Sequence, residues 1–142
     1  MVTSKRKLFV VVFALCFACG YAVTSDGRFF DHARSDLPTM AFLAEKYPLA
    51  CSVAVVVSAL PAFVVVEKFK ARAVAARIPF ASNWVLSSYA ACCGVGLGEL
   101  SFVLERLLRV HLIDLFVIQH AIWFFVLGLI GLTSTVLTRE VT

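Results

Sequence analysis

Residues 94–114, GVGLGELSFVLERLLRVHLID, place a carboxylate, Glu99, within a run that otherwise suits lipid. An ionisable side chain inside a membrane segment costs roughly 2.5–3.5 kcal/mol on insertion scales, so it normally faces protein, water or an opposite charge. His120 lies in the next apolar run. If the chain turns near Arg109, both side chains lie about 15 Å from the turn at 1.5 Å per residue. We therefore expect Glu99 and His120 to face each other.

Three roles are open for this intramembrane polar set. Glu99 and His120, with Gln119 and Ser101 nearby, could line a proton path or bind a polar headgroup. Glu99 could instead pair with a residue of another subunit and hold the chain in an assembly. It could also form an internal clasp with His120, or extend to the membrane interface. Small residues in the same run would let the helices approach closely: Gly94, Gly96 and Gly98.

The joint between the last two apolar runs carries five polar side chains: Glu105, Arg106, Arg109, His111 and Asp114. Glu105 and Arg109 are spaced i, i+4, which suits an ion pair on one helix face. The joint is too short for anything but a tight hairpin. We expect its acids and bases to satisfy one another at the membrane surface.

The composition places the chain in a membrane. Of its 142 residues 61% are hydrophobic and 15% charged, and the mean hydropathy is +0.94. Soluble domains are nearer 45–50% apolar and about 25% charged. The net charge of +4 comes from small basic clusters beside apolar runs, so nucleic acid is not an expected partner. Without a nucleophile–base pair, phosphate loop or metal-ligand spacing, we expect no enzyme, no metal site and no cofactor beyond structural phospholipids.

The apolar runs predict an all-α integral membrane protein with a single polytopic domain over residues 1–142. The basic KRK before the first run gives it the shape of a signal peptide, but we expect it to be retained as a transmembrane helix. A short interfacial helix is expected in the loop at 24–48. The four predicted spans are 8–25, 49–66, 84–104 and 112–137.

The distribution of lysine and arginine predicts the orientation. The amino terminus and the 67–79 loop are basic, so both termini should face the cytoplasm, or the matrix of a mitochondrion. The lipid bilayer is then the first partner. An anionic lipid such as cardiolipin is expected at the basic side chains of the 67–79 loop: Lys68, Lys70, Arg72 and Arg77.

Three sequence features resemble the Frag1/DRAM/Sfk1 family, particularly its branch that remodels the lipid of GPI anchors. They are an uncleaved first span, the segment SDLPTMAFLAEKYP at 35–48, and GELSFVLE followed about twenty residues later by QHAIWFF. The resemblance covers the first four spans of that family. It implies an endomembrane protein in lipid handling, with Glu99 and His120 as its polar membrane residues and no established catalytic role.

The residues themselves favour a different function. A small chain with four spans and no soluble domain is typical of a non-catalytic accessory subunit of a larger membrane complex, such as a respiratory assembly of the mitochondrial inner membrane, with other membrane subunits as partners. The alternatives are the Frag1-like lipid-handling protein of the endomembrane system and a small proton- or solute-conducting protein.

Overall fold

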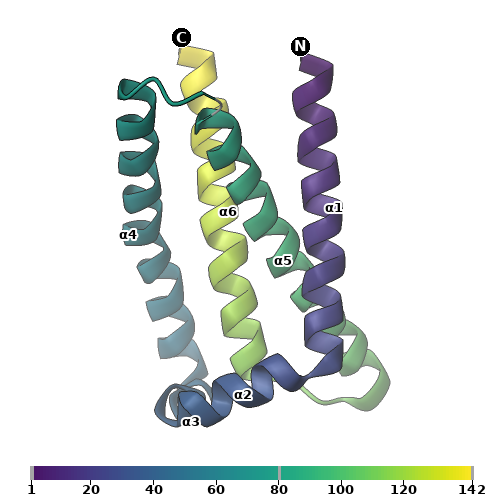
Figure 1. The fold of residues 1–142 in the computed structure, drawn as a ribbon. Coiled ribbons are helices and arrows are strands. Elements are labelled where there is room, and N and C mark those ends of the chain that lie inside the picture. The colour runs from purple at the N-terminus through teal and green to yellow at the C-terminus, as the bar shows by residue number, and fades with distance from the viewer. Residues whose placement is uncertain (1, 80, 142) are drawn as a thin grey trace.

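The computed structural model describes residues 2–79 and 81–141, and these residues form six α-helices. Two short helices, α2 (Arg28–Asp36) and α3 (Pro38–Lys46), lie across one end of the bundle (Figure 1). Both described ends of the chain lie at the opposite end. The all-α expectation is confirmed. The four long helices are α1 (Val2–Asp26), α4 (Pro48–Ala75), α5 (Ala81–Val110) and α6 (Leu115–Val141).

The first loop contains two short helices where the sequence predicted one. Leu37 has φ −126° and ψ 59°, outside the helical region, and Pro38 follows it. A proline ring clashes with a helical conformation at the preceding residue, so α2 ends at Asp36 and α3 begins at the proline. Tyr47 adopts the same conformation before Pro48 and separates α3 from α4.

Among the described residues, three helices are long and apolar enough to cross a membrane, by length and composition alone: Arg6–Asp26, Pro48–Ala75 and Leu115–Leu137. This confirms the coarse expectation of a multi-pass membrane protein. α5 is equally long but more polar, and it contains the predicted span 84–104. Helix α6 begins at Leu115, three residues after the expected start of the last span, because residues 111–114 are not helical.

Helix α5 lies between α1 and α6 and packs along both, whereas α4 packs mainly against α6 (Figure 1). The glycines of α5 allow this double contact. A methyl group at Gly98 would lie 2.2 Å from the carbonyl oxygen of Phe17 in α1, and one at Gly96 would lie 2.7 Å from that of Ala121 in α6. The glycines therefore allow α5 to pack closely against both α1 and α6.

Near the α2 end, a small apolar core joins three helices. Phe30 of α2, Val103 of α5 and Val117 of α6 are each at least 93% buried and pack together. This contact attaches α2 to the end of the bundle, directly beside the polar residues described next.

Candidate functional site

Glu99 and His120 lie side by side where α5 meets α6. The distance from Glu99 Oε2 to His120 Nδ1 is 2.8 Å, which is a hydrogen-bond distance. Glu99 is 2% exposed, whereas the His120 side chain is 30% exposed. Glu99 and His120 therefore face each other, as expected from the sequence, and the choice among the three roles stays a prediction.

Aromatic rings surround the imidazole of His120. The ring centroids of Phe29 and Phe30, both on α2, lie 5.8 and 5.2 Å from it, and that of Phe124 lies 4.9 Å away. The two rings of α2 meet the imidazole edge to face, which is favourable at these distances, and the ring of Phe124 is tilted against it. The contact between Glu99 of α5 and His120 of α6 is thus covered by α2.

The two polar neighbours predicted from the sequence are placed differently. Ser101 is half-buried on α5, two residues beyond Glu99. Gln119 is 8% exposed, and its amide nitrogen is buried without a hydrogen-bond partner in the described part of the chain. Neither side chain makes a hydrogen bond to Glu99 or His120 that the structure shows.

The charges of the hairpin do not all satisfy one another, contrary to the expectation. Glu105 and Arg109 form the predicted pair, at 3.0 Å, and Tyr21 of α1 donates a hydrogen bond to Glu105. Asp114 instead pairs with Arg34 of α2. The turn also lies later than expected, at 111–114, where His111 is exposed and has a φ of 55°.

Arg106 is the remaining member of the hairpin set. It is exposed and has no ion-pair partner among the described residues. The other charges of the hairpin therefore do not neutralise the guanidinium of Arg106, contrary to the prediction.

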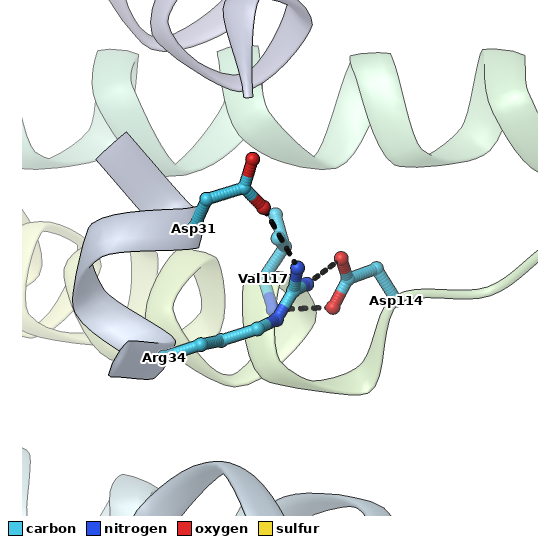
Figure 2. A network of polar contacts seen from close by, with 4 residues as sticks. All are labelled: Asp31, Arg34, Asp114 and Val117. Atoms are coloured by element: carbon cyan, nitrogen blue, oxygen red, sulfur yellow. Dashed lines mark hydrogen bonds and ion pairs between the residues drawn. The ribbon is translucent and has the colours of Figure 1, made fainter. Parts of the chain in front are cut away.

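Figure 2 shows the network around Arg34. Its guanidinium pairs with Asp114 and lies 3.5 Å from Asp31 on its own helix. The other oxygen of Asp114 accepts a hydrogen bond of 3.3 Å from the backbone N–H of Val117, in the first turn of α6. Asp114 thus caps α6 and holds α2 at the same time. The hydrogen bond with Asp114 raises the pKa of Arg34, so this guanidinium stays charged at any physiological pH.

Replacing Arg34 with glutamine should loosen α2. A hydrogen bond to a charged partner contributes about 1.5–3 kcal/mol, and partial exposure of this pair places it toward the low end. We expect faster trypsin cleavage after Arg28, at the exposed start of α2, in the variant than in the wild type. Lys46→Gln, at the end of α3, is the control; equal cleavage of all three proteins would contradict a role of Arg34 in holding α2.

The opposite end of the bundle has a polar contact of its own. The hydroxyl of the buried Tyr89 in α5 donates to Glu67 Oε1 of α4 at 2.8 Å, and Lys70 Nζ lies 3.8 Å from the same carboxylate. Lys68 and Arg72 of the predicted lipid-contact set are exposed.

Arg77 completes that set. It lies beyond the end of α4 with a φ of 56° and is exposed. The contact of these basic residues with anionic lipid stays a prediction.

Sequence reasoning missed Tyr21, Arg34, Glu67 and Tyr89. Arg34 and Asp114 are 80 positions apart, and Tyr21 and Glu105 are 84 apart. No spacing within one helix could indicate such contacts. Glu67 carried a weak signal, because it stands three residues before Lys70 in an otherwise basic segment.

Two adjoining cavities lie where α2 and α3 meet the α5–α6 turn. The first has a volume of about 320 Å³ and the second about 370 Å³. Four residues line both: Arg34, Arg106, Leu112 and Asp114. In the described chain there is no group of three or more His, Cys, Asp or Glu side chains that could hold a metal ion.

Comparison of the chain with protein-family models, with curated proteins and with solved structures found no match.

Proposed function

We propose that the chain crosses the membrane four times and acts as a non-catalytic structural subunit of a larger membrane complex. The fourth crossing is α5. It lies between α1 and α6, two helices that are apolar enough to span, and both described ends of the chain lie at the same end of the bundle (Figure 1). An even number of crossings accounts for that arrangement.

The polar side chains within the bundle support a structural role, because they join neighbouring helices. Each of these contacts would be costly to leave unmade in lipid, and each fixes one helix against the next. The contacts are Tyr21–Glu105 between α1 and α5, Glu99–His120 between α5 and α6, Tyr89–Glu67 between α5 and α4, and Arg34–Asp114 between α2 and the turn before α6.

The outer face of α4 carries the observation that favours a partner subunit. Ala50, Ala54 and Ser58 recur every four residues and are exposed on this helix. Small residues at this spacing let a second membrane helix approach closely. The proposed setting is an assembly such as a respiratory complex of the mitochondrial inner membrane, with the basic end of α4 at the matrix leaflet and its cardiolipin.

A native gel of mild-detergent extracts tests this proposal. We expect the wild-type chain to migrate with an assembly of several subunits, identified by mass spectrometry of the band. Ala54→Leu should block close approach at the small-residue stripe and release the chain, whereas Val56→Leu, exposed on α4 away from the stripe, should not. Migration of the wild-type chain alone would overturn the proposal.

A further inference from the structure

The two adjoining cavities at the α2 end form one recess with charged side chains in its wall. Arg34, Arg106, Leu112 and Asp114 line both of its halves, and the Arg34–Asp114 pair of Figure 2 is part of its wall. Each half is as large as the smaller ligand sites of proteins, which begin near 300 Å³. The recess is thus large enough to hold a small polar group.

The recess is bordered by charges of both signs. Arg34 is engaged by Asp114 and Asp31, whereas Arg106 has no ion-pair partner among the described residues. A guanidinium offers five donors in a planar fork that matches a phosphate. Arg106 is therefore the group in the recess that is available to an anion.

The wall of the recess also contains carboxylates, which outnumber its guanidiniums. Asp31 lines the first cavity and Glu45 of α3 lines the second, and both are exposed. An ionised carboxylate has about four acceptor positions, so the contact of Asp31 with Arg34 leaves acceptor positions free. Three carboxylates and two guanidiniums suit a ligand that carries a positive group as well as a phosphate.

The recess lies at the level where the apolar parts of α1 and α6 end. The apolar part of α1 ends at Asp26 and that of α6 begins at Leu115, and the first cavity is lined by residues at these levels, Gly27 and Asp114 among them. Phe102 and Val117 provide apolar wall on the same cavity. A ligand held here would keep its polar part at the membrane surface and its chains in the hydrocarbon.

We propose that this recess binds the zwitterionic headgroup of phosphatidylethanolamine, with its phosphate on Arg106 and its primary ammonium on the carboxylates of Asp31 and Glu45. A primary ammonium donates three hydrogen bonds, which the trimethylated headgroup of phosphatidylcholine cannot do. This site is at the opposite end of the bundle from the basic residues of α4. It is independent of the proposed subunit role.

The test uses the purified full-length chain in mixed micelles that contain equal amounts of phosphatidylethanolamine, phosphatidylcholine and phosphatidylglycerol. Native mass spectrometry then measures which lipid is retained. We expect enrichment of phosphatidylethanolamine, and a loss of about tenfold or more in Arg106→Gln, as for removal of one charge-assisted hydrogen bond. Arg109→Gln is the matched control, because Arg109 is exposed one turn further along α5 and lines neither cavity.

A second variant tests the ammonium. Glu45→Gln should keep the phosphate contact but reduce the preference for phosphatidylethanolamine over phosphatidylcholine.

Arg106→Gln should unfold at the wild-type temperature, because Arg106 makes no ion pair in the described structure. Competition by free phosphoethanolamine would support the headgroup chemistry and identify a water-soluble source. Equal retention of the three lipids, or wild-type retention by folded Arg106→Gln, would overturn the proposal.

Discussion

Gly98→Ala should separate α1 from α5 and lower the free energy of unfolding by about 2 kcal/mol or more. The added methyl group would lie 2.2 Å from the carbonyl oxygen of Phe17 and 2.9 Å from the backbone nitrogen of Tyr21. Both are main-chain atoms, so no change of side-chain rotamer relieves the clash. Overpacking of a close contact typically costs 1–3 kcal/mol, and here a whole helix must shift.

Thermal unfolding in detergent, followed with a thiol-reactive dye, measures the effect. Cys93 is buried and in no disulfide, so it becomes reactive on unfolding, whereas the exposed Cys19 reacts in the folded state and sets the baseline. We expect the midpoint of Gly98→Ala to fall by roughly 5 °C or more. Ala22→Val adds two methyl groups to an exposed position of α1 and should leave the midpoint unchanged.

A second substitution shows whether the displaced helix is α1. Tyr21→Phe removes the hydrogen bond from α1 to Glu105 and should destabilise the wild-type chain. In Gly98→Ala the same change should have little effect, because the bond is already broken. Additive effects of the two substitutions would contradict the displacement of α1.

The course of the helices could be predicted largely from apolar length. Each predicted span lies mainly within one of the four long helices, because lipid demands long apolar runs with their backbone bonds made internally. α5 is the instructive helix. Its Glu99 and Glu105 lower its hydropathy, yet it has protein on two sides, and its polar side chains contact α1 and α6.

Only the part of the site that lies within the α5–α6 hairpin could be predicted from the sequence. Glu99 and His120 belong to consecutive helices, so distance along the chain gave an approximate depth for both. That estimate used a turn at Arg109, whereas α5 continues to Val110. Residues 111–114 are not helical, so they cover more length per residue than a helix does. α6 therefore reaches the level of Glu99 within five residues of its start, and the pair still forms.

Contacts between segments that are far apart in the sequence could not be predicted from spacing. The sequence placed Asp114 with its neighbours in the hairpin, but the carboxylate pairs with Arg34, which reaches it because α2 lies across the end of the bundle. The direction of α2 follows from packing of Phe30 against α5 and α6, which is a tertiary contact. A short amphipathic helix does not specify its own partner.

Glu99→Leu and His120→Phe should each destabilise the bundle, whereas the double variant should recover most of the loss. Each single change leaves one polar group of the 2.8 Å contact without its partner in an apolar setting. The double variant leaves neither, and its new phenyl ring meets Phe29, Phe30 and Phe124 where the imidazole did. Replacing a buried polar pair with apolar residues is often neutral or stabilising.

Unfolding of the four proteins in mixed micelles gives the coupling energy between the two positions. Contacts of this kind in membrane proteins average about 0.6 kcal/mol and reach about 1.7, and the 2% exposure of Glu99 places this pair in the upper part of that range. Single losses that simply add would show that Glu99 and His120 act separately. Coupling of about 1 kcal/mol or more with recovery in the double variant would mean that the carboxylate holds α5 to α6, and that an apolar pair can replace it. A proton path could not survive that replacement, so proton flux through liposomes that contain the double variant separates the two roles: a structural contact predicts no change from the wild type, and a proton path predicts loss of flux.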